Sequence, residues 1–341
     1  MSEPEQPHRR RPRYSGKYPR RFEDKYKELD PEKYPETVAK VLASGKTPAG
    51  SHVPIMVAEI LDALAPQPGE RAVDCTLGFG GHAREILARI QPGGQLLGLD
   101  VDPIEQPRTE ARLRALGFGP ETLLVRRSNF AGLPKALAAE GWSGADLILA
   151  DLGLSSMQID TPARGFSVKV AGPLDMRMNP QKGQPASALL ARFQPDALAE
   201  LLRENADEPR AELLAQRLAG QTFALTTELA AAIRAALPNV SEDEREKSVR
   251  RVFQALRIAV NEEFAALDTL LRHLPECLNP GGRVAILTFH SGEDRRVKKA
   301  FQAALREGRF SAIAEDVIRP GADECRANPR ATSAKLRWAR R

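Results

Sequence analysis

Short apolar runs alternate with amphipathic stretches along the first half of the chain. Residues 71–77, 95–100, 122–128 and 145–153 are apolar runs of strand length, and the stretches between the first three carry apolar side chains at helical spacing. Strands that alternate with helices in this way form a mostly parallel sheet with right-handed crossover connections. The pattern therefore predicts an α/β fold, whose last apolar run, residues 281–290, comes only much later.

A long helical segment separates the fourth apolar run from the last one. It spans roughly 130 residues, too many for a loop in a compact fold. Helix formers dominate it, above all in residues 195–205, 210–220 and 226–237. Insertions at the carboxyl ends of parallel strands lie beside the ligand crevice, so we expect a helical domain that acts as a substrate-recognition cap.

The domain boundaries follow from these patterns. The predicted segments are a basic arm (residues 1–34), the first part of the core (35–157), the inserted helical domain (158–245) and the second part of the core (246–341). The arm is polar and rich in proline and arginine, a composition typical of disorder. Residues 251–264 carry apolar side chains on one helical face, and we expect this helix to pack on the sheet.

Charge and cysteine content indicate which partners and which cellular location to expect. The 50 Lys and Arg residues barely exceed the 45 Asp and Glu residues, but residues 8–21 and 328–341 are both rich in arginine. Basic arms suit a polyanion, although a solvated tail explains the first arm equally well. The three cysteines lack metal-ligand or disulfide spacing, which favours a reducing, cytoplasmic location without a metal site. No apolar run approaches the ~20 residues that cross a bilayer, so we expect no membrane segment.

A glycine-rich turn follows the first predicted strand in "AVDCTLGFGGHAREI", residues 72–86. Gly78, Gly80 and Ala83 fit the relaxed dinucleotide fingerprint, and Asp100 ends the next strand about twenty residues on, where an acid meets a ribose. Together these features predict a nucleoside-binding half-unit. The alternative is that the glycines serve only the sharp bend.

Asp74, at the end of the first strand, bears on the ligand's charge. A carboxylate so close to the turn disfavours a phosphate, whereas S-adenosylmethionine has no phosphate and carries a sulfonium and an ammonium. The acids therefore favour S-adenosylmethionine over a dinucleotide. The other interpretation of Asp74 is a helix cap.

Polar residues at two further strand ends are candidates for the chemistry. Asp151, Ser155 and Gln158 follow the fourth strand, where amino-methylating enzymes present polar groups to an extruded base; turn formation is the alternative. His290 follows the last strand and precedes a basic helix with Arg295 and Lys298, which we expect to contact substrate phosphates unless it is a solvated face.

Arg257 and Asn261 lie one turn apart on the helix predicted over residues 251–264. We expect Arg257 to meet a phosphate of the substrate. For Asn261, a buried and satisfied amide is the alternative to substrate contact.

Eight blocks in order, from about His52 to the C-terminus, carry a family resemblance. They are "HVPIMVAEIL", "DCTLGFGGHA", "LGLDVDP", "LADLGLSSMQID", "RGFSVKVAGPLDMRM", "FQALRIAVNEE", "FHSGEDRRVKKAF" and "NPRATSAKLR". The chain resembles the ribosomal small-subunit RNA methyltransferase H family. The resemblance implies a Rossmann-like class I S-adenosylmethionine-dependent fold with an inserted helical domain, and N4-methylation of a cytidine in the decoding region of 16S ribosomal RNA.

The resemblance also implies residue roles. Gly80, Gly81 and His82 would line the methionine end of the cofactor, Asp100 would meet its ribose and Phe130 would flank its adenine, with Asp151 and Gln158 completing the pocket. The candidate catalytic residues are Asp151, Ser155 and His290, and the candidate substrate contacts are Arg257, Asn261, Arg295 and Lys298. The chain departs from the family at Cys75, Ala83 and Gly292, where glycine, serine and leucine are common.

The expected partners are 16S ribosomal RNA or the small ribosomal subunit, and a homodimer is compatible with the sequence. Three other functions compete with the proposed one. A dinucleotide-dependent oxidoreductase explains the glycine turn but not Asp74 or the basic ends. A non-catalytic RNA-binding protein leaves the pocket without a use. A methyltransferase that acts on another RNA, a protein or a small-molecule amine keeps every feature of the pocket.

Overall fold

The computed structural model describes residues 54–341. The predicted basic arm, residues 1–34, and residues 35–53 of the predicted core lie outside the described residues. The described chain begins just before α3 (Val57–Leu64), whose Ile60 and Leu64 are buried against the sheet. This short helix follows the apolar spacing of its sequence.

A seven-stranded sheet forms the centre of the fold, in the order β3-β2-β1-β4-β5-β7-β6. Its strands are β1 (Arg71–Asp74), β2 (Gln95–Asp100), β3 (Leu123–Arg127), β4 (Ala145–Asp151), β5 (Leu278–Thr288), β6 (Ala312–Ile313) and β7 (Lys335–Arg340). The first five are parallel, so their carboxyl ends meet at one edge, while β7 is antiparallel to both β5 and β6. The five predicted strands and their parallel arrangement are confirmed.

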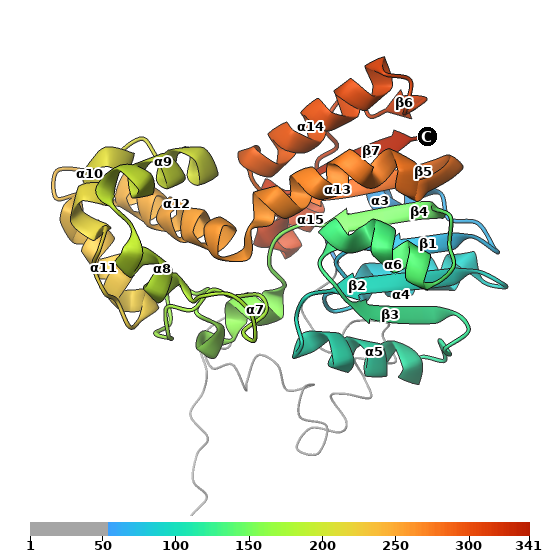
Figure 1. Cartoon of the computed structure of the whole chain (residues 1–341), viewed down its shortest axis with the longest axis horizontal. Helices are drawn as coiled ribbons and strands as arrows, with labels where there is room; N and C mark the ends of the chain where they lie inside the picture. The colour runs from blue at the N-terminus through green and yellow to red at the C-terminus, as the bar shows by residue number, and fades with distance from the viewer. Residues whose placement is uncertain (1–53) are drawn as a thin grey trace, which may run out of the picture. The chain divides into compact units, whose positions relative to one another are not determined.

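Helices cover both faces of the sheet (Figure 1). Leu147 and Leu149 of β4 join one apolar cluster with α3, α4 (Gly81–Ile90) and α5 (Glu105–Ala115). Ile148 and Ala150 point the other way, into a cluster with α6 (Leu133–Ala139), α13 (Glu263–Cys277) and α14 (Ser291–Arg306). Because successive strand residues face opposite sides, an almost continuous apolar run is what a strand buried on both faces requires.

The arginine-rich C-terminal stretch belongs to the sheet. Leu336 and Ala339 of β7 are fully buried, and Arg337 between them donates from Nε to Asp294 Oδ1 at 2.7 Å. The prediction of a basic arm over residues 328–341 is therefore wrong at this end. Leu336 and Ala339 are buried in the two clusters on opposite faces of the sheet, and this burial determines the place of the strand more than the charge of its arginines does.

Five helices form a separate apolar cluster, and Figure 1 shows them grouped together. They are α8 (Ala186–Arg192), α9 (Pro195–Ala206), α10 (Ala211–Leu218), α11 (Thr226–Ala236) and α12 (Glu242–Asn261). Val252, Phe253 and Leu256 of α12 are buried in this cluster. The helix expected over residues 251–264 to pack on the sheet therefore packs on other helices, and the cluster includes residues on both sides of the expected boundary at 245.

Short elements complete the described chain: η2 (Phe130–Gly132), α7 (Ser156–Asp160), η3 (Pro162–Arg164), α15 (Ala322–Ala327) and η4 (Pro329–Ser333). Glu262, with φ 52°, separates α12 from α13, so the predicted helix over residues 251–264 is in fact the end of one helix and the start of another. Across residues 54–341, no helix combines the length and apolar character needed to span a bilayer.

Candidate active site

The glycine turn after β1 is held against α5. Gly78 and Gly80 have φ values of 47° and 78°, a left-handed conformation that glycine adopts without steric cost. Thr109 of α5 donates from Oγ1 to the Gly78 carbonyl oxygen at 2.5 Å. The turn is thus fixed by its own geometry and by a neighbouring helix, with the first turn of α4 directly after it.

The chain before α3 crosses this turn. A Cβ on Gly81 would lie 2.2 Å from Cγ of Pro54, closer than any real contact. The next residue, His82, is buried, and its Nε2 lies 2.9 Å from the Ile55 carbonyl oxygen. Since a carbonyl only accepts, this contact places a proton on Nε2 and leaves Nδ1 as the unprotonated nitrogen of the neutral ring.

Replacing Gly81 by alanine should destabilise the fold by about 1–3 kcal/mol, because Pro54 must move away from the new methyl group. The shift would also disturb the contact between Ile55 and His82, so cofactor affinity should fall as well. Thermal unfolding measures the first effect. Gly321→Ala is the control, because a Cβ there meets nothing within 4 Å; equal melting temperatures for the two variants would contradict the close packing at Gly81.

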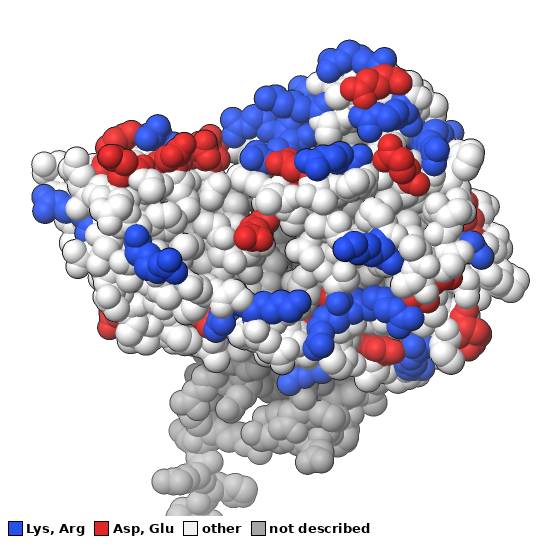
Figure 2. All heavy atoms as spheres, viewed as in Figure 1, with Lys and Arg blue, Asp and Glu red and all other residues white. Residues whose placement is uncertain are grey.

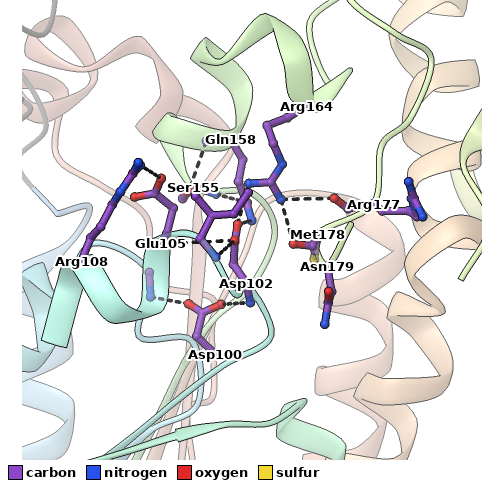
Figure 3. A network of polar contacts seen from close by, with 12 residues as sticks. Asp100, Asp102, Glu105, Arg108, Ser155, Gln158, Arg164, Arg177, Met178 and Asn179 are labelled. Carbon is purple, nitrogen blue, oxygen red and sulfur yellow. Dashed lines mark hydrogen bonds and ion pairs between the residues drawn. The ribbon is translucent and has the colours of Figure 1, made fainter. Parts of the chain in front are cut away.

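Asp100 at the end of β2 faces the turn. Its Oδ2 accepts from the Gly78 amide and its Oδ1 from the Asp102 amide, both at 2.8 Å (Figure 3). Burial is the main influence on its carboxyl group and raises the pKa, against the lowering effect of these amides. Each carboxylate oxygen retains acceptor capacity for a second donor, which fits the two hydroxyls of a ribose.

The residues around Asp100 also fit an adenosine. Ser128, just after β3, donates its amide to the Asp100 carbonyl oxygen at 2.9 Å. Phe130 lies two residues further on, at the start of η2, and is half-buried. The sequence-predicted residues Asp100 and Phe130 therefore lie at the same edge of the sheet.

Three carboxylates surround the glycine turn: Asp74, Asp100 and Asp151. Asp74 accepts the Thr76 amide at 3.0 Å, and burial raises the pKa of its carboxyl group to about 6. Asp151 keeps 29% of its side chain exposed and lies with Oδ2 3.6 Å from His82 Nδ1. Such a set repels phosphates and attracts cations, in agreement with a sulfonium ligand.

The pKa values of Asp151 and His82 are both shifted from their usual values. Burial raises the pKa of Asp151 to about 7, with a further contribution from the negative charge of Glu293. Burial also lowers the pKa of His82, although the Ile55 carbonyl opposes that effect. At neutral pH the histidine is therefore mainly neutral, and Asp151 titrates near the pH at which an enzyme operates.

Ser155 and Gln158 make a capping box at the start of α7. Ser155 Oγ accepts the Gln158 amide at 3.2 Å, and Gln158 Oε1 accepts the Ser155 amide at 3.0 Å. Gln158 also donates from Nε2 to Asp102 Oδ2 at 2.9 Å. The hydroxyl of Ser155 thus caps the first turn of α7. This role agrees with the turn-forming alternative stated from the sequence.

His290 lies at the start of α14, at the end of the last parallel strand. Its ring lies 5.7 Å from the ring of Phe264, centroid to centroid, and its Nε2 lies 3.2 Å from Glu293 Oε1. Burial pushes the pKa of Glu293 up, but His290 and Arg257 outweigh it and bring the pKa below its usual value. Glu293 also accepts the Phe289 amide at 2.9 Å, so its carboxylate ties the start of α14 to the end of β5.

Two of the side chains predicted to contact the substrate, Arg257 and Asn261, bind other groups of the protein instead. Arg257 donates from Nε and Nη2 to both carboxylate oxygens of Glu263, at 2.8 and 2.9 Å, which opposes the expected phosphate contact. Asn261 is a satisfied amide: it donates to the carbonyls of Met176 and Arg257 and accepts the Met178 amide. Its contacts are therefore those of a satisfied amide, the alternative to substrate contact.

The other two predicted contacts lie on the surface of α14. Arg295 pairs with Asp207 at 2.9 Å, with both side chains about half exposed. Lys298 and its neighbour Lys299 are exposed. Figure 2 shows Lys and Arg side chains gathered over the part of the surface that α14 forms. This helix presents positive charge to solvent, as its sequence predicts.

Sequence reasoning missed Asp102 and Arg164. Asp102 is 1% exposed, and its Oδ2 accepts from Arg164 Nη1 at 2.7 Å. Asp102 stands in "LGLDVDP" and Arg164 in "RGFSVKV", both within blocks that carry the family resemblance. An acid two residues after a strand and an arginine in another of these blocks were the available signals, but nothing in the sequence pairs them.

The fold and the site together define a class of protein. A parallel sheet in the order 3-2-1-4-5, extended by an antiparallel pair, carries a glycine turn after β1 and an acid at the end of β2. This is a Rossmann-like class I methyltransferase that uses S-adenosylmethionine. Residues 49–341 match the family model described as the MraW methylase family, and the chain belongs to that family.

Three relatives are similar over 85–99% of this chain. A protein of Alkaliphilus metalliredigens named ribosomal RNA small subunit methyltransferase H 2 is 49% identical, with 99% of each chain covered. Ribosomal RNA small subunit methyltransferase H 1 of Lachnoclostridium phytofermentans is 48% identical over 97% of this chain and 93% of its own. The protein named ribosomal RNA small subunit methyltransferase H in Thermomicrobium roseum is 42% identical over 85% and 94%.

Two solved structures are similar to this chain at low sequence identity. A putative rRNA-methylase from Clostridium thermocellum is 9% identical, with a TM-score of 0.42 over 85% of this chain and 98% of its own. A putative methyltransferase from Streptococcus mutans in complex with SAH is 12% identical, with a TM-score of 0.41 over 85% and 99%.

Proposed function

We propose that this methyltransferase methylates N4 of a cytidine in the decoding region of 16S ribosomal RNA. The observation that carries the proposal is Asp151: a partly exposed carboxylate at the end of β4, beside His82 and the glycine turn. Relatives that are 42–49% identical bear the name of ribosomal RNA small subunit methyltransferases H. The geometry supports a proton-accepting role for Asp151, and the names of the relatives support ribosomal RNA as the substrate.

The residues of the pocket divide the work between binding and chemistry. S-adenosylmethionine, when bound, supplies a methyl group on a sulfonium. Asp100 accepts from the ribose hydroxyls, Phe130 flanks the adenine, and Gly80, Gly81 and His82 line the methionine end. Asp74 and Asp151 contribute negative charge that favours a cationic ligand. No residue needs a phosphate partner in this arrangement.

Asp151 is the group that acts on the amine. The exocyclic nitrogen of cytosine is a poor nucleophile, because its lone pair is delocalised into the ring. A carboxylate that accepts a hydrogen from this amine concentrates the lone pair on nitrogen, and it would take the amine proton as the N–C bond forms and the S–C bond of the sulfonium breaks to leave S-adenosylhomocysteine. Ser155, as the cap of α7, holds the loop after Asp151 in place, and His290 anchors the neighbouring strand end.

His82 supports Asp151 in this role. Its Nε2 proton is committed to the Ile55 carbonyl, so its Nδ1 lone pair faces Asp151 across 3.6 Å. A protonated Asp151 therefore has a proton acceptor 3.6 Å away, just beyond hydrogen-bond distance. The pair stores one proton between substrate deprotonation and release to solvent, with small movements of either side chain.

The substrate must reach a crevice at the carboxyl edge of the sheet. A base has to leave its stack to do so, at a cost of about a few kcal/mol. Backbone contacts from Arg295 and Lys298 on α14 would offset this cost, because each releases a counterion from the RNA. Arg257 is paired with Glu263, so it contributes to this surface by holding the end of α12.

The rate of methylation should depend on pH through Asp151. The carboxylate is the active form, so the single-turnover rate should rise as the pH passes the Asp151 pKa of about 7 and level off above it. One pH unit below that value the rate should be about a tenth of the plateau. The Asp151→Asn variant should lose this dependence, and a wild-type rate that is flat between about pH 6 and 8 would exclude the role of base.

Nucleoside analysis tests the proposed substrate. The protein, labelled S-adenosylmethionine and small ribosomal subunits that lack the modification are incubated together, and the RNA is then digested to nucleosides. Label in N4-methylcytidine is the expected result. Label in another nucleoside, in ribosomal protein or in a small-molecule amine would assign the same pocket to a different substrate.

A further inference from the structure

Arg164 is a buried guanidinium, 8% exposed, at the end of η3. Its Nη1 donates to Asp102 Oδ2 at 2.7 Å. Its Nη2 donates to the carbonyl oxygens of Arg177 and Met178, at 3.2 and 2.8 Å (Figure 3). One side chain therefore joins the loop after β2 to the segment around Met178.

On one side, Asp102 fixes the cofactor-binding loop. Its amide donates to Asp100 Oδ1 at 2.8 Å, and its own Oδ1 accepts the Ile104 amide at 2.9 Å at the start of α5. Asp102 thus holds the Asp100 carboxylate through its amide and the start of α5 through its own carboxylate. A change in its position would move the acceptor that meets the ribose.

On the other side, the segment around Met178 is bound to the helical domain. The Met178 amide donates to Asn261 Oδ1 at 2.7 Å, and Asn261 Nδ2 donates to the Met176 carbonyl oxygen at 2.8 Å. Asn261 is the last residue of α12, the longest helix of the helical cluster in the described chain. Arg164 is thus two side-chain contacts away from this helix.

We propose that Arg164 is a positioning residue that couples the cofactor pocket to the helical domain. A guanidinium presents donors on separate nitrogens in a fixed fork, so Nη1 reaches the carboxylate while Nη2 reaches the two carbonyls, whereas a lysine presents its three donors from a single nitrogen. The ion pair of Arg295 with Asp207 also joins α14 to the helical domain, but it is exposed and contributes little. Buried Arg164 is the stronger link, and its loss leaves the Asp102 charge buried without a cation.

The coupling works in both directions. Ribose hydroxyls bound at Asp100 hold its loop and Asp102 in one position, and Arg164 then holds the Met178 segment and the end of α12. By linkage, a substrate that fixes the helical domain should raise cofactor affinity by the same factor by which bound cofactor raises the affinity for that substrate. The inference rests on the cofactor alone and holds whatever substrate the protein methylates.

Hydrogen exchange with S-adenosylhomocysteine as the probe tests this coupling without any substrate. In the wild-type protein, the probe should slow exchange both at the glycine turn and at the amides of residues 174–178. In Arg164→Met, the probe should still protect the glycine turn but no longer residues 174–178, and its affinity should fall about tenfold. Arg164→Lys should restore part of the affinity and little of the coupling.

Arg283→Met is the matched control. Arg283 pairs with Glu70 and with the carbonyls of Leu64 and Ala65, which are the same kinds of partner as those of Arg164, at the opposite edge of the sheet. Its variant should lose comparable stability but keep the probe-dependent protection of residues 174–178. Full protection of that segment in the Arg164 variants would overturn the proposal. If Arg164→Met does not fold, Arg164→Lys alone decides the outcome by the same criterion.

Discussion

Replacing Asp151 by asparagine should lower the single-turnover methylation rate at least tenfold while leaving RNA affinity nearly unchanged. Tenfold corresponds to ~1.4 kcal/mol of barrier. The amide keeps the size of the carboxylate, but it has neither the charge that favours a developing positive amine nor the basicity to take its proton. Because binding and chemistry respond differently, the variant separates the two.

The comparison needs saturating cofactor, because Asp151 also lies in the cofactor pocket. Asp146→Asn is a suitable control: it changes the same strand at its other end, where Asp146 accepts the Arg71 amide at 2.9 Å and the Asn279 side chain at 2.8 Å. That variant should retain its rate at saturation. A near-normal rate for Asp151→Asn would move the chemistry to the backbone of residues 152–155 or to His290.

The Asp100→Ala variant should bind S-adenosylmethionine more weakly by about 1.5–3 kcal/mol, a loss of roughly ten- to 150-fold. The ribose hydroxyls lose a charged acceptor, and the amides of Gly78 and Asp102 lose theirs as well. Titration calorimetry on the folded variant gives the number. Asp100→Asn should lose less, because its amide oxygen still accepts one of these donors; unchanged affinity in the alanine variant would remove Asp100 from the site.

The sheet was predictable because strands that are buried on both faces consist of nearly continuous apolar residues. Apolar runs such as "LILA" in β4 fill both sides of the sheet, and the glycine turn and Asp100 occur at the spacing that this architecture requires. These features depend on local sequence alone. They are therefore sufficient to place the cofactor pocket at the carboxyl edge of the sheet.

The errors concern both what a segment packs on and, in β7, the type of the segment. The apolar face of residues 251–264 correctly indicated helix, but periodicity cannot say whether a helix packs on a sheet or on other helices. In β7, arginines drew attention to charge, whereas Leu336 and Ala339 determine its place in the sheet. Arg257 and Glu263 lie only six residues apart, yet their pairing depends on the break at Glu262.

The pairing of Asp102 with Arg164 illustrates the same limit at long range. The two residues are 62 positions apart, and each looks like an ordinary charged residue beside a turn. Only the folded arrangement brings η3 against the loop after β2. Contacts of this kind form when two loops from different elements meet, and sequence patterns of period two or 3.6 carry no record of them.

The most direct test of the proposed function is to map methylated nucleotides in 16S ribosomal RNA from cells that contain the protein, cells that lack it, and cells that carry only the Asp151→Asn variant. We expect one N4-methylated cytidine in the decoding region with the wild-type protein, and its absence or strong reduction in the other two. An unchanged methylation map in cells without the protein would contradict the proposed substrate, whatever the cofactor pocket binds.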